Sequence, residues 1–571
     1  MPGLSRGELL AAARGFCDSF ARKEPIEAIL SHFSSPSSSA GEAGAGSGTA
    51  STAGDREILV REHGLPQLAP FLGRDFRGLE GAREYFETVG ACLDYEDMRF
   101  VEFLVDDDAC GPESDGGKVA VRGQARFTWI ETGLDWDETF VYVLLFDALG
   151  KAFDLKYVLV PLFVGASLFG FNATIITMIH NGLAPVLESI GSGAVASLKG
   201  APAPFLRSYT GVASVDRRLC GVVAFFSCLI DGNVPWDVTV FYVWGMAQFA
   251  AGWTLLVLEA KRAGNRGRLV SWIGTVGILF QGLTWTFTIP LYLALHLLTS
   301  PVAKLKNGDG DGARRALFVY LWDLALLPMA VTLTFVVPTI FMSMPRLFDQ
   351  TAATHYSWVA VWQPFPAWTI LALGFLHYAC YYALGSLSPV DEENKPTTNG
   401  HGYMVAVRGV YEFMIALCSA AHVPAMALTL MPEAGREFLS HAFPYYAPVF
   451  RKLSFAKTFI PQPWYDAPTI DVAAYRSGDP AILAQHFLQY DFYVGTGAML
   501  LWAMYVHQRA VKNPSLVKML QKTAFWLVIG GPVAAAAVLI WDRDGVTQEG
   551  ETELKKKMEQ GLESSEGRKT K

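Results

Sequence analysis

The pattern of hydrophobic and polar positions changes near residue 157. Before this point apolar residues alternate with polar ones, whereas after it apolar runs of about 20 residues recur, the length that a transmembrane helix needs. Eight such runs lie at 157–179, 238–258, 269–298, 316–342, 366–386, 404–430, 489–507 and 523–541. The pattern therefore predicts a polytopic α-helical membrane bundle of about eight spans over residues 157–541.

A shorter apolar run, 219–230, precedes Asp231 and Gly232. It is predicted to be a ninth span, a re-entrant half-helix or the near arm of a hairpin. The run 269–298 exceeds a straight span, so it can tilt or break, with Pro290 as a candidate kink. Residues 542–571 are rich in charge and are predicted to form a solvated, mostly disordered tail.

Residues 1–156 are predicted to form a small α+β domain. Apolar residues at three- and four-residue spacing predict a helix over 8–33, and a second helix follows within 76–89. Alternating β-branched and aromatic residues then predict three strands, at 98–105, 119–130 and 137–151. The segment 34–54 is dominated by Ser, Gly and Ala and is predicted to be a flexible loop.

Composition agrees with a membrane protein and narrows the choice of partners. The chain has 571 residues, 51% of them hydrophobic, and a mean hydropathy of +0.26, which is too apolar for an ordinary soluble protein of this size. A net charge of −8 and a pI near 5.8 argue against a nucleic-acid partner, which would favour a basic surface. Residues 1–30 carry charges throughout and show no cleavable signal peptide.

Ionisable side chains inside predicted spans are costly to bury and are therefore candidates for chemistry. Asp323, Glu412 and Asp491 lie within or at the start of spans, and Asp231 follows the short ninth run. A carboxyl group that is removed from water favours its protonated form and can serve as an acid. The alternative for Glu412 is an i,i+4 ion pair with Arg408, and for Asp323 and Asp491 it is a role as polar anchors.

Other polar groups in the bundle are predicted to be structural. Glu259 precedes a basic loop and His296 lies near a span end, so both are predicted to be interfacial. Neither a DDxxD nor a DxDD cluster occurs in the bundle, and the DDD at 106–108 is predicted to be a solvated turn. We therefore expect no metal ion and no other cofactor.

Aromatic residues are concentrated in the predicted span 269–298, which carries Trp272, Phe280, Trp285 and Phe287. The faces of aromatic rings attract positive charge, so a cavity walled by them can hold a carbocation. Placement of the same rings at the membrane interface is the alternative.

The N-terminal segment resembles the SnoaL-like (ketosteroid-isomerase-like) superfamily over residues 8–156. The resemblance rests on FRGLEGAREYF and on TGLDWDETFVYVLLFDALGK, and it implies an α+β cone. Polar residues that could line such a cone, with surface positions as the alternative, are His63, Asp75, Tyr85, Arg122 and Glu138.

The bundle resembles the fungal integral membrane terpene cyclases of the ascofuranone and macrophorin pathways. The resemblance rests on SYTGVASVDRRLCGVVAFFSCLIDG, on the bundle that follows and on FLQYD. It implies metal-independent, acid-initiated cyclisation of a lipophilic prenyl chain of a meroterpenoid, in the endoplasmic reticulum or a related endomembrane. The choice of Asp323, Glu412, Asp491 and then Asp231 as acids comes from their position in the spans.

Two other functions remain open at this point. A metabolite transporter would favour internal repeats, and no clear repeat relates 157–342 to 366–541. A membrane-anchored SnoaL-like polyketide cyclase or binding module would use the bundle as a scaffold.

Overall fold

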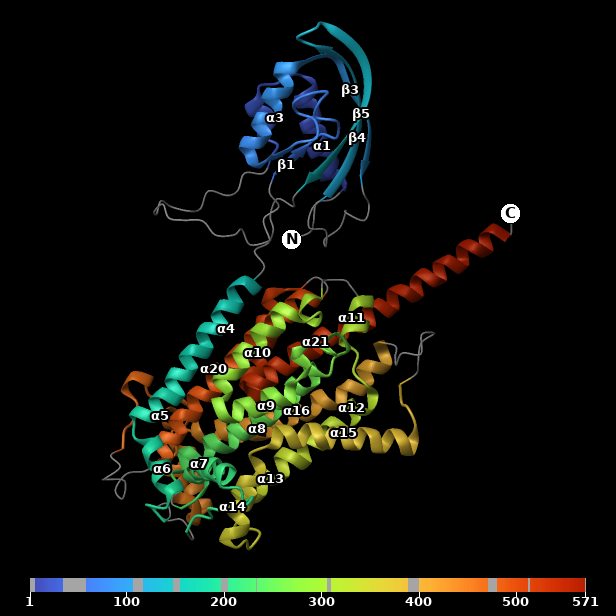
Figure 1. Cartoon of the computed structure of the whole chain (residues 1–571). Coiled ribbons are helices and arrows are strands. Elements are labelled where there is room, and N and C mark those ends of the chain that lie inside the picture. Colours follow the sequence, from blue (N-terminus) through green and yellow to red (C-terminus); the bar gives the residue numbers. More distant parts are fainter. Residues whose placement is uncertain are drawn as a thin grey trace. The chain divides into compact units, whose positions relative to one another are not determined.

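The chain divides into two units, Met1–Asp154 and Leu155–Lys571, drawn in Figure 1. The computed structural model describes residues 6–33, 58–105, 117–146, 155–196, 204–232, 234–305, 310–388, 400–470, 480–511 and 514–569. The predicted loop 34–54 and the acidic turn 106–108 lie outside the described residues.

The first unit begins with two helices, α1 (Arg6–Ala21) and α2 (Ile26–Leu30), where the sequence pattern predicted one. Pro25 precedes α2, and proline interrupts a helix because it lacks a backbone N–H. Helix α3 (Gly78–Cys92) follows a two-stranded ribbon of β1 (Leu59–Arg61) and β2 (Asp75–Arg77). These strands escaped prediction because three residues are too few to show alternation.

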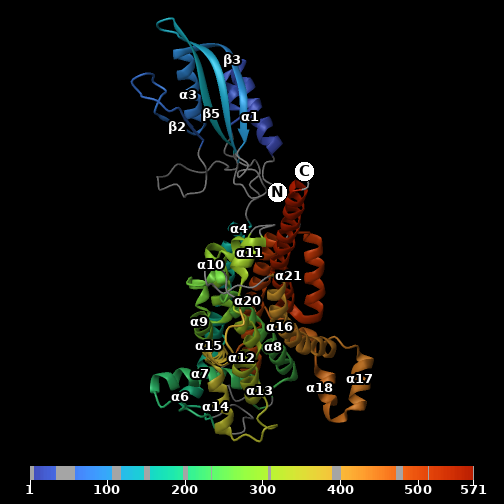
Figure 2. The same cartoon turned by 90° about the vertical axis from the view of Figure 1, so that its right-hand side faces the viewer.

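An antiparallel sheet of β3 (Leu93–Val105), β4 (Gly117–Trp129) and β5 (Leu134–Phe146) completes the first unit, in that order. Val119 and Val121 of β4 are fully buried against Leu9 and Ala13 of α1, while Arg122 points to the exposed face. Figure 2 shows the curved sheet with α1 and α3 beside it. The three predicted strands are confirmed, and residues 147–151 of the last predicted strand lie outside the described residues.

The second unit is helical. Its α-helices are α4 (Lys156–Phe171), α5 (Thr177–His180), α6 (Leu183–Ser192), α7 (Ala213–Ile230), α8 (Trp236–Ala260), α9 (Ile273–Leu283), α10 (Trp285–Thr299), α11 (Gly310–Leu317), α12 (Leu321–Val331), α13 (Val337–Ser343), α14 (Ala352–Trp362), α15 (Phe365–Leu384), α16 (Gly400–Thr429), α17 (Glu433–Ala442), α18 (Ala447–Lys452), α19 (Phe455–Phe459), α20 (Pro480–Ala510) and α21 (Leu516–Lys569).

Six helical segments of the described chain are long and apolar enough to cross a membrane. They are Lys156–His180, Trp236–Ala260, Leu321–Ser343, Phe365–Leu384, His401–Thr429 and Leu516–Gln548. Each coincides with a predicted span. The other two predicted spans correspond to the α9–α10 pair and to part of α20, so the count of eight stays a prediction.

The long apolar run 269–298 is broken at Thr284 rather than bent at Pro290, which lies inside α10. The φ of Thr284 is 80°, an uncommon value for a β-branched residue, and it persists only where the surroundings enforce it. The Thr284 hydroxyl accepts a hydrogen bond from the Phe287 N–H at 3.3 Å and so caps α10. The break therefore creates a new helix N-terminus inside the bundle.

The sequence pattern predicted that the bundle ends at residue 541, but the chain remains in the bundle beyond this residue. Helix α21 continues beyond this residue, with a break at Gly531 where φ is 81°. The side chains of Arg543 and Asp544 are completely buried. They remain inside because opposite charges on other helices face them, a pairing that no local sequence window shows.

Candidate functional site

A cavity of about 1290 Å³ lies within the helical bundle. Helices α7, α8 and α20, the α9–α10 junction and the α14–α15 turn form its wall. Aromatic rings dominate this wall: Phe225, Phe226, Phe241, Phe249, Phe280, Trp285, Trp362, Trp368, Phe487 and Phe492. Pockets for drug-sized ligands usually measure about 300–1000 Å³, so this cavity has room for a longer apolar molecule.

Several of these rings form a close box around Phe249. Its centroid lies 4.6 Å from that of Trp285 and 5.6 Å from that of Phe280, each in an edge-to-face arrangement. Two of the aromatic residues singled out in the sequence, Phe280 and Trp285, thus line the cavity. Trp272 does not line it and is 60% exposed.

Asp491 of α20 lies on the cavity wall, next to the broken α9–α10 junction. Its carboxylate accepts a hydrogen bond from the backbone N–H of Thr286 at 2.8 Å. The backbone N–H of Trp285 and the hydroxyl of Thr284 are further donors to it. Within the described chain no basic side chain forms an ion pair with Asp491, so its nearest partners are the donors at the start of α10.

The other three predicted acids lie elsewhere and have partners of their own. Asp231 is hydrogen bonded to His355 at 2.7 Å, and both are buried. Asp323 faces a separate cavity of about 450 Å³, with His377 Nδ1 at 2.8 Å and Lys261 Nζ at 3.4 Å.

Glu412 accepts a hydrogen bond from Arg408 Nε at 2.6 Å, and its side chain is 51% exposed. The i,i+4 ion pair named as the alternative is therefore present. Of the four candidates, Asp491 alone lines the large cavity.

Four residues of the cavity wall carry buried polar atoms without a hydrogen-bond partner in the described structure. They are Trp285 Nε1, Trp362 Nε1, Gln363 Oε1 and Gln281 Nε2. The two tryptophans and Gln363 are at most 6% exposed. Buried polar groups in proteins are nearly always hydrogen bonded, so these four side chains mark positions where polar groups interrupt the mostly apolar wall.

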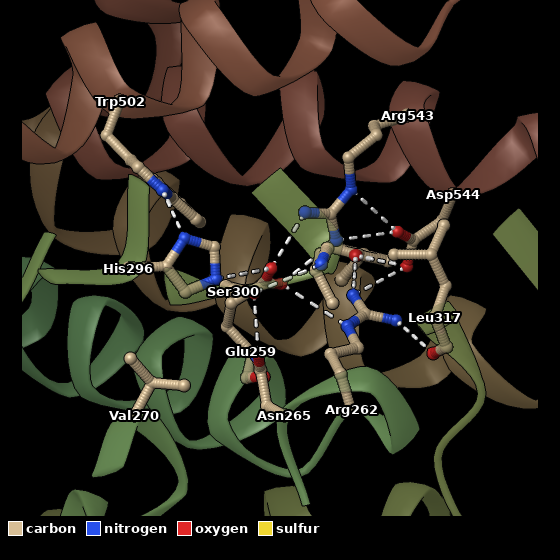
Figure 3. A network of polar contacts seen from close by, with 12 residues as sticks. Glu259, Arg262, Asn265, Val270, His296, Ser300, Leu317, Trp502, Arg543 and Asp544 are labelled. Carbon is tan, nitrogen blue, oxygen red and sulfur yellow. Dashed lines mark hydrogen bonds and ion pairs between the residues drawn. The ribbon is translucent and has the colours of Figure 1, made fainter. Parts of the chain in front are cut away.

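A second polar cluster, which the sequence analysis missed, lies outside this cavity. Figure 3 shows this cluster. Arg543 donates to both carboxylate oxygens of Glu259, at 2.8 and 2.9 Å. Arg262 donates to Asp544 at 2.7 Å and to Glu259 at 3.3 Å. All four side chains are at most 1% exposed, and their formal charges cancel. We call this cluster the buried ion network.

Further side chains enclose the buried ion network. The Tyr411 hydroxyl donates to Asp544 at 2.7 Å, and Tyr403 contacts both Arg262 and Asp544. His296 Nε2 lies 3.4 Å from Glu259, and its Nδ1 accepts from the Trp502 indole at 3.1 Å. The interfacial roles predicted for Glu259 and His296 are therefore wrong: helices α16, α20 and α21 cover both residues.

Because residue 495 of α20 is a glycine, the ring of Trp285 has room beside Asp491. A Cβ at Gly495 would lie 2.1 Å from Trp285 Cδ1, whereas a Cβ at Gly497 would meet nothing within 4 Å. We expect Gly495→Ala to destabilise the protein by about 1–3 kcal/mol, the usual cost of overpacking a core. Gly497→Ala is the matched control. Thermal unfolding of both purified variants checks this, and equal midpoints would contradict it.

The family model of the CtvD domain matches residues 155–547. The chain belongs to this family. The match begins where the helical unit begins and includes Asp491 and the buried ion network. The structure thus places both polar sites within the CtvD domain, and the N-terminal unit lies outside it.

Curated relatives in this family carry the name terpene cyclase. The terpene cyclase ascI of Acremonium egyptiacum is 26% identical over 376 residues, 64% of this chain and 85% of the relative. The terpene cyclase janA of Penicillium janthinellum is 23% identical over 397 residues, 67% of this chain and 95% of the relative. The terpene cyclase ctvD of Aspergillus terreus is 22% identical over 355 residues, covering 60% and 87%.

The predicted membership of the fungal terpene cyclase family is therefore confirmed. No solved structure matches the chain. The SnoaL-like assignment of the N-terminal unit stays a prediction.

Proposed function

We propose that this protein is a terpene cyclase that cyclises the prenyl chain of a meroterpenoid precursor, with Asp491 as the proton donor. The observation that carries the proposal is the position of Asp491, a carboxyl group on the wall of a large aromatic cavity. Family membership supports it, because the curated relatives compared above are named terpene cyclases.

The proposed reaction starts when the carboxyl group of Asp491 gives its proton to a terminal epoxide oxygen or alkene of the bound chain. As the C–O bond of the epoxide breaks, or as the alkene is protonated, the electron pair of the next double bond forms the first ring bond. The resulting carbocation is stabilised by the faces of rings such as Trp285 and Phe280. Loss of a proton from the last cation forms an alkene and ends the sequence, so substrate and product are isomers.

The hydrogen bonds around Asp491 fix the direction in which its acid points. The N–H groups at the start of α10 hold one side of the carboxyl group. Its other side faces the apolar cavity, where a bound substrate excludes water. A carboxylic acid held in such a site can protonate a weakly basic substrate at neutral pH.

We also propose that the helical unit crosses a bilayer about eight times, in the endoplasmic reticulum or a related endomembrane. The six long apolar helices support this. A membrane location also suits a lipophilic prenylated substrate, which would reach the site from the lipid. Resistance of the protein to alkaline carbonate extraction from microsomes tests the membrane part. Release into the soluble fraction would contradict it.

The decisive experiment is product analysis with microsomes that contain the full chain. A prenylated phenol with a terminal epoxide is supplied with and without a divalent-metal chelator. We expect a cyclic product with the mass of the substrate, formed equally under both conditions. Unchanged substrate, or a requirement for magnesium, would contradict the proposal.

A second candidate is catalysis by the N-terminal unit, which we propose to be SnoaL-like. Tyr85 donates a hydrogen bond to Glu62 at 2.8 Å, and burial raises the pKa of this carboxyl group. Asp75 and Arg122, by contrast, lie in the ion pairs Arg61–Asp75 and Arg122–Glu102. Loss of product formation in Glu62→Gln, with Asp491→Asn active, would favour this candidate. The reverse result favours Asp491.

A further inference from the structure

One side of the large cavity differs from the rest because it is polar. Ser208, Tyr209, Thr210, Ser214 and Arg218 line it, and all belong to one short stretch of the chain at the start of α7. The other walls are mostly apolar and aromatic. The cavity therefore has two chemically distinct regions, one around this stretch and one around Asp491.

Asp216 organises the polar stretch. Its carboxylate accepts hydrogen bonds from the backbone N–H and hydroxyl of Thr210, both at 2.8 Å, and from the Ser208 hydroxyl at 3.0 Å. The backbone N–H of Gly211 adds a fourth at 3.2 Å. These bonds, the one from the Thr210 N–H foremost, lower the pKa of Asp216 to about 2. The loop is thus folded around a fixed negative charge.

Arg218 does not neutralise that charge. Among the residues that the structure describes, Arg218 forms no ion pair and no hydrogen bond, although Asp216 lies two residues away and is buried. Its side chain is both exposed and part of the cavity wall, which places it at the opening. A guanidinium group only donates hydrogen bonds, and it prefers carboxylates and other oxyanions as partners.

The polar region and Asp491 are joined by an aromatic path. Helix α7 rises about 10 Å between Arg218 and Phe225. The ring centroid of Phe225 lies 5.1 Å from that of Phe487, which precedes Asp491 by one helical turn on α20. A long molecule can therefore place one end at Arg218 and extend an apolar tail along these rings to Asp491.

We propose that the substrate of this cyclase is amphiphilic and that Arg218 binds an acidic head group, a carboxylate or an ionised phenol, at the cavity opening. This inference rests on the proposed function, because it assigns the tail to Asp491. The same chemistry occurs in anionic lipid head groups, so the experiment must separate the two sources.

The test compares two substrates with the same prenyl epoxide tail, one with a free acidic head group and one with that group methylated. We expect Arg218→Gln to raise the KM for the acidic substrate about tenfold, the effect of one charge-assisted hydrogen bond at an exposed site. The KM for the methylated substrate and kcat for both should stay within twofold. Arg218→Lys should recover part of the loss.

Arg217→Gln is the matched control. Arg217 is also exposed and also unpaired in the described structure, but it does not line the cavity. We expect wild-type KM values from it. Equal effects of Arg218→Gln on both substrates, or no effect on either, would overturn the proposal. The effect of Arg218→Gln could instead depend on added anionic phospholipid and be the same for both substrates. That result would assign the site to lipid head groups and would also overturn the proposal.

Binding is measured separately from turnover, by the change in tryptophan fluorescence when substrate is added to Asp491→Asn. Head-group selectivity in this assay, lost on adding Arg218→Gln, supports the proposal even if no cyclic product forms in any variant. In that case the proposed reaction fails and the binding site stands. A lack of selectivity in an enzyme that does form product overturns the binding site alone.

Discussion

Replacing Asp491 by asparagine is expected to abolish product formation while the protein stays folded. The amide oxygen of asparagine can still accept the hydrogen bond that the Thr286 N–H donates at 2.8 Å, so the start of α10 remains capped. An amide has no proton acidic enough to activate an epoxide or alkene. General acid catalysis contributes about 10²–10⁴-fold to rates, and we expect a loss of at least that order. Product per folded protein in microsomes is the measurement.

Two further variants separate acid catalysis from capping. Asp491→Ala removes both the acid and the cap, so it should be inactive and also less stable. If the carboxyl group serves only as a cap, Asp491→Asn will be active and Asp491→Ala will not. Glu412→Gln should keep full activity, because Glu412 is half exposed and paired with Arg408 away from the cavity. Activity of Asp491→Asn within tenfold of wild type would exclude Asp491 as the acid.

The features that the sequence predicted best are those that depend on local composition. Apolar runs of about 20 residues identify helices whatever packs against them, and alternation identified the strands β3 to β5. Asp491 became a candidate because a charged residue in an apolar run is conspicuous. The sequence did not distinguish Asp491 from Asp323. The partners of Asp323 in the structure are Lys261 and His377, which lie far from it in the chain.

The features that escaped prediction depend on contacts between distant helices. Glu259 and Arg262 precede further basic residues, and Arg543 and Asp544 follow the last apolar run. In the sequence, both pairs therefore resemble charged residues at the edge of a solvated loop. Each pair is costly to bury alone. Only their approach across α8 and α21 makes burial possible, and no window of one helix contains that information.

The break at Thr284 escaped prediction for a similar reason. The residues around it, GLTWTFTIP, contain no proline or glycine at the break itself. The φ of 80° at Thr284 is maintained by its own cap on Phe287 and by the donors that Asp491 binds. A strained residue beside the candidate acid is consistent with a functional site, since such strain concentrates where geometry serves chemistry.

Replacing Asp544 by asparagine is expected to destabilise the protein strongly. The buried ion network contains two carboxylates and two guanidinium groups, all at most 1% exposed. Asp544→Asn leaves a net positive charge among them, and uncompensated buried charges typically cost about 3–5 kcal/mol. Total stabilities are about 5–15 kcal/mol, so we expect a large fall in the unfolding midpoint and in the yield of folded protein.

Asp542 provides the control, since it lies two residues from Asp544 on the same helix. Its side chain is 33% exposed and pairs with Lys522 at 2.5 Å. Asp542→Asn should cost no more than about 1 kcal/mol, as for other exposed pairs. Equal midpoints for the two variants would show that the network is not what holds α21 against α8.

The double variant Arg262→Met with Asp544→Asn removes the compensating positive charge as well. We expect it to restore part of the unfolding midpoint, because the two remaining charges, those of Glu259 and Arg543, are still paired at 2.8 and 2.9 Å. A double variant as unstable as the sum of the single ones would mean that packing around Arg262, rather than charge balance, dominates.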